Sequence, residues 1–354
     1  MMVKTATIED ILICHLAWCG VAARMINLML TTCTSDERQA AVANAHDAQE
    51  LHAGLRADEA CISPKFLYDA LGSKLFEAIC ELPEYYPTRT EAAIFERHGA
   101  EIARVAGLGT TLIDLGAGNC AKAAKLFPLL QPAQYVAVDI SSEFTHDALA
   151  RLRQRFPQIA MEALGMDFSN RFELPDLVRA ERRLFFYPGS SLGNFTPEDA
   201  QAFLARLRAQ CGPDGGILIG IDLAKDGAVL DAAYDDALGV TAAFNLNVLR
   251  HANRLLGADF DIRAWRHHGF YNEREGRVEM HLEARSAQQV VWQGGSRRFE
   301  AGECIHTENS YKYRPAAAVG LLEQAGFAAA GVWTDERGWF AVIHARAIAP
   351  GALH

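Results

Sequence analysis

Short apolar runs alternate with amphipathic stretches through the middle of the chain, between about residues 111 and 223. The first run, TLIDLGAG, is apolar and ends in glycines, which is typical of a buried parallel strand that leads into a tight turn. Strands that alternate with helices predict right-handed βαβ crossovers and a doubly wound sheet. We expect strands within residues 111–118, 134–140, 159–168, 182–189 and 215–223, and helices within 120–130, 141–156 and 197–211.

The alternation breaks after residue 223. A long helical stretch is interrupted near Gly239, and two later segments alternate polar and apolar residues with a period of two, which predicts an antiparallel sheet or meander. The helical stretch covers residues 228–257, the alternating segments 277–285 and 288–294, and the tail is expected to form a helix at 316–326 and a strand at 338–348. We therefore predict an α/β domain over residues 90–224 and a second, α+β domain built from residues 36–89 and 225–350.

The amino-terminal segment, residues 1–35, differs from the rest. Its apolar run from Ile11 to Leu30 contains Arg24 and follows two acidic residues, so it is too polar for a spanning helix of about 20 apolar residues. A signal peptide is not indicated either, because no small-residue cleavage site follows the run. Two interpretations stay open: an amphipathic docking helix, or a stretch upstream of the native start codon. Later methionines at positions 25 and 29 favour the second.

Composition excludes several classes of protein. The chain has 34 Lys and Arg against 44 Asp and Glu, a formal charge of −10, which argues against a nucleic-acid partner because such binding needs a basic face. Its 8 cysteines form no CxxC pair and its 12 histidines no HExxH motif, so we expect reduced thiols and no metal. These features favour a cytoplasmic protein, which we expect to be a monomer without a membrane or nucleic-acid partner.

Three elements in order indicate a cofactor. Gly116 and Gly118 lie between the first strand and its helix, where glycines let the backbone approach a ligand closely. The loop matches neither GxGxxG nor a phosphate-binding GxxxxGK motif. Asp139 ends the second strand, where a carboxylate can accept both ribose hydroxyls, and Asp167 with Phe168 follows the third strand, facing the adenine. This order favours S-adenosylmethionine over the alternative of a generic βαβ turn with surface acids.

Longer blocks of sequence resemble one family. The segment SPKFLYDALGSKLFEAICELPEYYPTRTEAAIF, residues 63–95, resembles the signature of the histidine-specific S-adenosylmethionine-dependent methyltransferases, the L-histidine Nα-methyltransferases of ergothioneine biosynthesis. Further blocks follow in the family order at 186–200, 222–261, 278–284 and 306–314, so the resemblance covers about residues 60–347. It implies an α/β fold with a doubly wound, Rossmann-like class I methyltransferase domain and a second α+β substrate-binding domain.

The resemblance also implies residue roles. The family's cofactor positions fall on Gly116, Lys122, Asp139, Asp167 and Phe168. Its histidine-binding positions fall on Tyr85, Asn194, Tyr234, Glu308 and Ser310. Met280 corresponds to a residue near the substrate ring, and Tyr68 to a tyrosine lining the methyl-transfer site, which makes Tyr68 the catalytic candidate.

These residue types suit the implied chemistry. Neutral imidazole has one donor and one acceptor nitrogen, so Glu308 can accept from one while Ser310 or Tyr85 addresses the other. Asn194 and Tyr234 can hold the carboxylate, which leaves the α-amine facing the sulfonium methyl. An α-amine titrates near pH ~8, so no strong base is obligatory, and Tyr68 or water can relay the proton. Three transfers would give hercynine, the trimethylated betaine.

Two alternatives stay open. A relative could methylate another amino acid or amine; an acid at Glu308 suits imidazole, whereas an apolar residue would suit an indole or phenyl ring. A catalytically idle cofactor-binding module is the other alternative, and the presence of both cofactor and substrate residues disfavours it.

Overall fold

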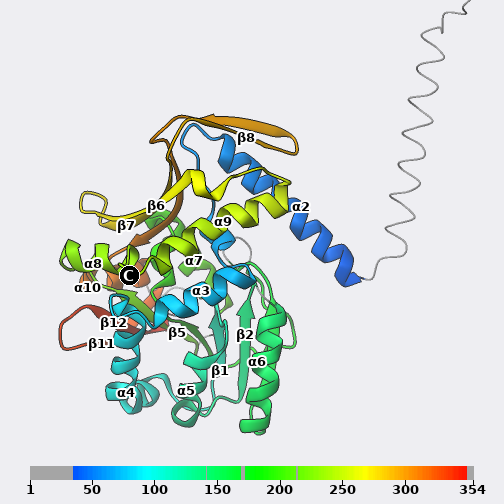
Figure 1. Cartoon of the computed structure of the whole chain (residues 1–354). Coiled ribbons are helices and arrows are strands. Elements are labelled where there is room, and N and C mark those ends of the chain that lie inside the picture. Colours follow the sequence, from blue (N-terminus) through cyan, green and yellow to red (C-terminus); the bar gives the residue numbers. More distant parts are fainter. Residues whose placement is uncertain (1–34, 141, 169–171, 213, 349–354) are drawn as a thin grey trace, which may run out of the picture.

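A seven-stranded sheet forms the centre of the protein (Figure 1). The structure is a computed structural model that describes residues 35–140, 142–168, 172–212 and 214–348. The strand order is β11-β12-β5-β4-β1-β2-β3, and the five strands from β1 to β5 are parallel. These five match the predicted ones: β1 Thr111–Leu115, β2 Gln134–Asp139, β3 Ala160–Gly165, β4 Arg183–Tyr187 and β5 Gly216–Asp222.

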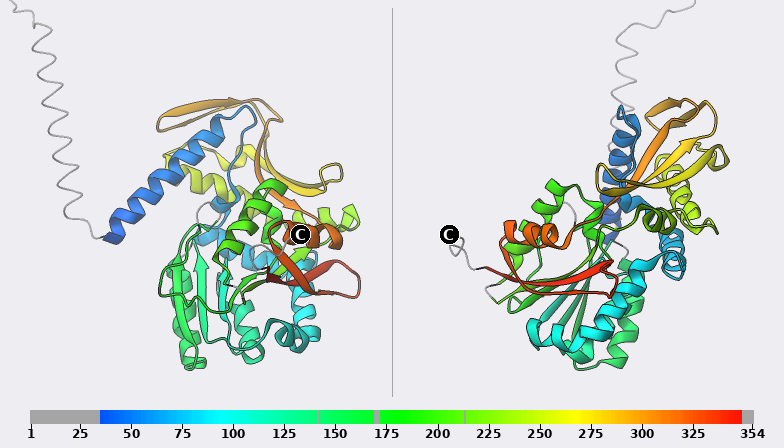
Figure 2. Two further views of the ribbon diagram at one scale, coloured as in Figure 1. Left: turned by 180° about the vertical axis from the view of Figure 1, so that it is seen from behind. Right: turned by 90° about the vertical axis from the view of Figure 1, so that its left-hand side faces the viewer.

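Helices cover both faces of this sheet (Figure 2). Successive β1 residues point to opposite sides: Ile113 packs in one apolar cluster with α7 and α10, and Leu112 packs in another with α4, α5 and α6. Burial on both faces explains why β1, β2, β4 and β5 are largely continuous apolar runs rather than alternating ones, whereas β3, at the edge of the sheet, is only partly buried. The helices are α4 Tyr86–Ala106, α5 Ala121–Leu130, α6 Ser142–Arg155, α7 Pro197–Gln210 and α10 Pro315–Gln324.

The carboxy-terminal tail completes the central sheet. Strand β12, Phe340–Ala347, pairs antiparallel with β5, and β11, Phe327–Thr334, pairs antiparallel with β12 at the edge. The sequence analysis assigned this tail, as part of residues 225–350, to the second domain. It predicted the strand at 338–348 but no strand at the position of β11. Most of the edge strand β11 is exposed, so its Ala- and Gly-rich sequence shows no clear hydrophobic period. The apolar strand β12 is buried on both faces and therefore belongs to the main core.

A second layer lies over the carboxyl ends of the parallel strands (Figure 1). It contains an antiparallel sheet of β10-β7-β6 and the hairpin β8–β9. Its strands are β6 Trp265–Asn272, β7 Arg277–Ala284, β8 Gln288–Trp292, β9 Gly295–Phe299 and β10 Cys304–Tyr311. Its helices are α2 Ser35–Arg56, α3 Ala70–Cys80, α8 Gly227–Tyr234 and α9 Val240–Leu256, with 3₁₀ turns η1 Pro64–Leu67, η2 Ser191–Asn194 and η3 Ile262–Ala264.

The predicted helix break near Gly239 is confirmed. Helix α8 ends at Tyr234, and α9 begins after Gly239, whose φ is 75°. The Asp236 carboxylate accepts the N–H groups of Val240 and Thr241 at 3.0 and 2.7 Å, which caps α9. Of the predicted amino-terminal extension, residues 1–34 lie outside the described residues. Within the described part of the chain, no helix is long and apolar enough to cross a membrane.

Candidate active site

The glycine turn after β1 is tied to the end of β2. Gly116 and Gly118 have φ values of 71° and 51°, conformations that residues with a side chain rarely adopt. The Gly118 N–H donates to Asp139 Oδ2 at 2.8 Å. A Cβ atom at Gly118 would meet nothing within 4 Å, so the turn faces open space. The turn and the acid that the sequence indicated for the cofactor are therefore joined, with room beside them for a ligand.

The third predicted cofactor element lies beside this turn. The Phe168 ring comes to 4.0 Å from where a Gly116 Cβ would lie, so it flanks the turn as an apolar wall. Asp167 Oδ2 is 3.8 Å from Lys65 Nζ, and the same ammonium pairs with Asp47 and Glu50 of α2 at 2.8 and 2.7 Å. Charge pairing thus links helix α2 to the edge of the cofactor site, a contact that the sequence did not indicate.

Lys122, a predicted cofactor residue, is paired with a glutamate that the sequence analysis did not name. Lys122 Nζ lies 2.7 Å from Glu91 Oε2, and the other oxygen of Glu91 accepts the Gly189 N–H at 2.8 Å. Burial acts to lower the pKa of Lys122, but Glu91 outweighs it and the pKa is raised. Glu91 is buried, so it joins α4, α5 and the end of β4 beneath the cofactor turn.

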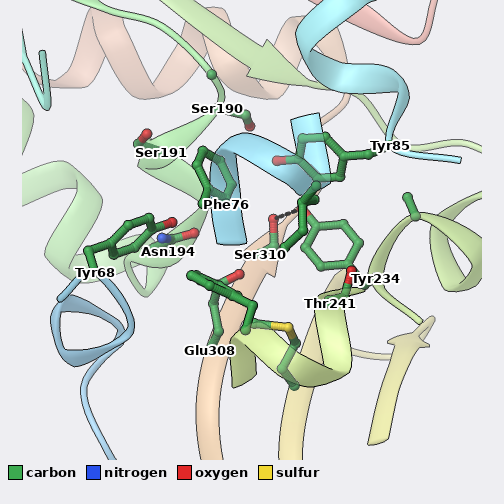
Figure 3. Close-up of a pocket in the computed structure, with 15 residues that line it drawn as sticks. Tyr68, Phe76, Tyr85, Ser190, Ser191, Asn194, Tyr234, Thr241, Glu308 and Ser310 are labelled. Atoms are coloured by element: carbon green, nitrogen blue, oxygen red, sulfur yellow. Dashed lines mark hydrogen bonds between the residues drawn. The ribbon is translucent and has the colours of Figure 1, made fainter. Parts of the chain in front are cut away.

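One cavity collects the remaining predicted residues (Figure 3). Its lining includes all those assigned to the substrate or to catalysis: Tyr68, Tyr85, Asn194, Tyr234, Met280, Glu308 and Ser310. They come from elements spread over most of the chain. The lining also contains residues that sequence reasoning missed: Phe76, Ile79, Gly189, Ser190, Ser191, Ala233, Thr241 and Phe244. Because Gly189 and Ser190 directly follow β4, the cavity opens at the same sheet edge as the glycine turn.

A β-bulge brings the two polar residues of β10 into the cavity. His306 pairs with His281 of β7, but Glu308 pairs with Met280, so Thr307 is one extra residue in the strand. The Thr307 hydroxyl donates to the Met280 carbonyl at 2.9 Å. Without the bulge, Glu308 would share the outward face with His306, because side chains alternate along a strand. The bulge therefore turns Glu308 and Ser310 inward.

Glu308 occupies a buried position and is only 7% exposed. Burial raises its pKa to about 7, with Lys312 acting in the opposite direction. At neutral pH the empty site therefore holds a carboxyl group close to its titration midpoint. A ligand N–H that donates to this group would favour the ionised form.

A buried charge network lies behind Tyr234 and Ser310. Lys312 Nζ is 2.9 Å from Asp222 Oδ2, and Asp222 Oδ1 also contacts Lys225 Nζ at 2.5 Å. The ammonium of Lys312 donates to the hydroxyls of Tyr234 and Ser310 at 2.9 and 2.6 Å. The sequence block HTENSYKYR contained Lys312, but nothing in its pattern distinguished this lysine from a surface one.

Aromatic rings form the other wall. The Tyr68 ring packs edge-on against Phe76 and Phe244, each at 5.5 Å between centroids, and Tyr85 packs edge-on against Tyr234 at 6.1 Å. Burial and, secondarily, the charge of Glu308 raise the pKa of Tyr68 well above its usual value. Tyr68 is therefore a phenol at neutral pH, able to donate one hydrogen bond and to accept others.

Asn194 is positioned by a close contact between the two layers. It ends the 3₁₀ turn η2, and the neighbouring Gly193 packs against β10 so tightly that an added Cβ would lie 2.8 Å from the Tyr311 carbonyl oxygen. Only glycine permits this approach. The contact holds Asn194, which follows β4, next to Ser310 of the second layer.

The strand order 3-2-1-4-5 followed by an antiparallel pair, with a glycine turn after β1 and an acid after β2, defines a class I S-adenosylmethionine-dependent methyltransferase. Comparison with protein families is more specific. The chain belongs to the histidine-specific, S-adenosylmethionine-dependent methyltransferase family, whose profile matches residues 47–347.

Several curated relatives resemble most of the chain. The histidine N-alpha-methyltransferase of Mycolicibacterium smegmatis is 41% identical over 298 residues, which cover 82% of this chain and 92% of that protein. The protein of the same name from Mycobacterium tuberculosis is 38% identical with the same coverage. A more distant relative, an L-tryptophan methyltransferase of Psilocybe serbica, is 27% identical over 79% of this chain and 87% of its own.

Proposed function

We propose that this protein transfers a methyl group from S-adenosylmethionine to the α-amino group of L-histidine, three times in succession, to form hercynine in ergothioneine biosynthesis. One observation carries the choice of substrate: the bulge at Thr307 places a carboxyl group and a hydroxyl group, those of Glu308 and Ser310, in the lining of one cavity. The proposal agrees with the family to which the chain belongs and with the two histidine N-alpha-methyltransferases that it resembles.

The pair at the bulge suits a ring with two nitrogens. Glu308 accepts the ring N–H, and the hydroxyl of Ser310 donates to the other nitrogen. Met280, which pairs with Glu308 across the strands, packs against the ring. A competing side chain without nitrogens would leave the Glu308 carboxyl group buried without a partner, which is a large penalty. A phenyl ring incurs this penalty, and an indole, which has one N–H but no lone-pair nitrogen, would leave the hydrogen of Ser310 without an acceptor.

The cofactor residues form a second group at the same sheet edge. Gly116, Gly118 and Asp139 would hold the adenosyl part beside the Phe168 ring, and Lys122 stabilises the turn through Glu91. When bound, S-adenosylmethionine supplies an electrophilic methyl group on a sulfonium. The work of the chain is to exclude water and to aim the amine at that methyl group, which accounts for much of the rate enhancement in such displacements.

The amine end lies towards Tyr68 and Asn194 in this proposal. The Asn194 amide binds the α-carboxylate, the Tyr234 hydroxyl is bonded to Ser310 at 2.8 Å, and the phenol of Tyr68 accepts a hydrogen bond from the amine. Tyr68 is not a strong base, so the amine loses its proton through water, as its pKa near ~8 permits. The amine can lose another proton after each of the first two transfers, and the third transfer yields a permanent cation.

The test is a competition assay with purified protein. An equimolar mixture of the common amino acids, tryptophan included, is incubated with S-adenosylmethionine and analysed by mass spectrometry. We expect mono-, di- and trimethylated histidine and no other methylated amino acid. A methylated product from another amino acid, with histidine untouched, would contradict the proposal.

Partners and location complete the proposal. We infer a cytoplasmic protein that works as a monomer. The cysteines of the described residues, Cys61, Cys80, Cys120, Cys211 and Cys304, are free thiols, as a reducing compartment favours. Sedimentation of the pure protein at assay concentration tests the monomer.

A further inference from the structure

Lys312 is a buried lysine that the mechanism above does not use. It does not line the cavity, yet it contacts two residues that do, Tyr234 and Ser310. Its side chain is fully buried. Burial acts to lower its pKa, but Asp222 and Tyr234 outweigh this effect and raise it, so Lys312 is an ammonium ion. A buried cation this close to a binding site affects the direction of every hydrogen bond around it.

All donors of this ammonium are used. Lysine has three N–H donors, and Lys312 has three acceptor oxygens in reach: Asp222 Oδ2 at 2.9 Å, Tyr234 Oη at 2.9 Å and Ser310 Oγ at 2.6 Å. Both hydroxyl oxygens therefore accept a hydrogen from Lys312. Burial raises the pKa of Tyr234, although Lys312 opposes the shift, so this hydroxyl keeps its own hydrogen.

The two hydroxyls then share one further bond. Tyr234 Oη and Ser310 Oγ are 2.8 Å apart, so one of them donates to the other. Two hydroxyl hydrogens serve one mutual bond, and one hydrogen remains. Since Lys312 occupies the space behind both oxygens, the remaining hydrogen points into the cavity. This corner therefore presents a donor to the substrate.

The charges around the cavity agree with this count. Two carboxylates, Asp222 and ionised Glu308, face two ammonium ions, Lys225 and Lys312. Burial lowers the pKa of Lys225 to about 8, so it is mostly charged at neutral pH. These four charges sum to zero, and the sum stays zero when the ligand ring is neutral. An imidazolium would add an uncompensated buried charge beside Lys312, which is costly.

The geometry points to Lys312 as a positioning residue that orients the Tyr234 and Ser310 hydroxyls and thereby selects the neutral imidazole form of histidine. This inference rests on the proposed function. The ring N–H is directed at Glu308, and its lone-pair nitrogen receives the remaining hydroxyl hydrogen. Without Lys312, the Tyr234 and Ser310 hydroxyl oxygens could accept a hydrogen bond from the ring. This part of the cavity would then tolerate a second ring proton.

The test uses histidine labelled with ¹⁵N in the imidazole ring, bound to the full protein together with S-adenosylhomocysteine, which cannot donate a methyl group. Nitrogen chemical shifts distinguish one protonated ring nitrogen from two. In the unmodified protein we expect a single protonated nitrogen from pH 6 to 8. A bound imidazolium at neutral pH would overturn the inference without any variant.

Variants then assign the effect to Lys312. In Lys312→Met, the pH at which the bound ring gains its second proton should rise by about one unit, a roughly tenfold change in that equilibrium. Lys312→Gln keeps N–H donors without the charge, so its shift should be smaller than that of Lys312→Met. Lys225→Met is the matched control: it also removes one of the four buried charges, but Lys225 contacts neither the Tyr234 nor the Ser310 hydroxyl, so it should give only the smaller part of the shift that charge alone causes. An equal shift in Lys225→Met would contradict the role of Lys312.

The two proposals fail differently. If histidine receives no methyl group, the proposed function is contradicted. If histidine is methylated but binds as an imidazolium, only the role of Lys312 is contradicted. Should Lys312→Met not fold, Lys312→Gln and the spectrum of the unmodified protein still decide the question.

Discussion

The proposed cofactor side, at the glycine turn, and the proposed substrate side, in the cavity, are built by different means. On the cofactor side, backbone conformation does most of the work: Gly116 and Gly118 turn the chain, and Asp139 of the next strand accepts the Gly118 N–H. On the substrate side, side chains form the lining of the cavity, and they come from segments as distant in the chain as the end of η1 and β10. The first kind of site follows from a strand, a turn and a helix, whereas the second needs the whole fold.

Because of this difference, the two regions should differ in how strictly they select their ligands. A backbone turn accepts any cofactor of suitable shape, and its glycines can be replaced only at the cost of strain. Buried side chains such as Glu308 discriminate between ligands because an unpaired polar group in the cavity is costly. Substitutions on the two sides should therefore produce different kinds of defect.

The largest effect is expected on the substrate side. Glu308→Ala removes the acceptor for the ring N–H, so kcat/KM for histidine should fall by about 100-fold, the value of a charged hydrogen bond. Affinity for S-adenosylhomocysteine, measured by calorimetry, should stay within about twofold, since the proposal places the cofactor beside Gly116, Gly118 and Asp139 and away from Glu308. Asn309→Ala is the matched control: it is the next residue on β10 and bonds the outward-facing His306 at 2.9 Å. Equal histidine kinetics in Glu308→Ala and Asn309→Ala would refute the assignment of Glu308.

The cofactor side should give the opposite pattern. Asp139→Ala removes the acceptor that holds Gly118 and, by the proposal, the partner of the ribose hydroxyls. The dissociation constant of S-adenosylhomocysteine should rise by about 10-fold or more. With saturating cofactor, the preference for histidine over other amino acids should not change. A changed substrate preference would show that the two sides are not separable in this way.

A smaller effect is expected where the two layers meet. In Gly193→Ala the new methyl group would collide with the Tyr311 carbonyl, 2.8 Å away, and displace Asn194. We expect a roughly 5- to 10-fold loss in kcat/KM for histidine with unchanged cofactor affinity, because a small misplacement of a binding residue weakens orientation. Gly320→Ala in α10, where a Cβ meets nothing within 4 Å, is the control. It should leave activity unchanged and stabilise the helix by about 0.5–1 kcal/mol.

A further effect is on stability and depends on pH. Because burial raises the pKa of Glu308 to about 7, its protonated form is favoured in the folded protein, and this stabilising contribution is lost as pH rises through 7. Glu308→Gln cannot ionise, so it should lose less stability than the unmodified protein between pH 5 and pH 8, by on the order of 1–3 kcal/mol. Thermal or denaturant unfolding at both pH values measures the difference. The same pH dependence in both proteins would show that Glu308 titrates normally.

The central fold could be predicted because its signals are local. Strands β1, β2, β4 and β5 are largely continuous apolar runs, since burial on both faces requires that, and the alternation of all five strands with helices specifies the crossovers. The tail could not be placed, because pairing between β12 and β5 joins segments more than 100 residues apart. Nothing in the periodicity of either segment encodes which sheet it enters.

The resemblance named side chains that the fold brings together, but it did not give their geometry. Blocks of resemblance pointed to Tyr85, Asn194 and Glu308, and these line one cavity. The bulge at Thr307 could not be predicted, because one extra residue in a strand leaves no trace in composition, yet it decides which face Glu308 occupies. Lys312 was missed for a related reason: only the fold shows that this lysine is buried against Asp222.

The position of the transferred methyl group tests the account most directly. If Glu308 and Ser310 bind the ring nitrogens, those nitrogens are engaged and only the α-amine can reach the methyl donor. S-adenosylmethionine with a ¹³C-labelled methyl group is incubated with L-histidine and the protein, and the product is examined by NMR for coupling between the new methyl carbon and the histidine skeleton. The account predicts that the label couples through nitrogen to the α-carbon. Label on a ring nitrogen, coupled to ring carbons, would contradict it.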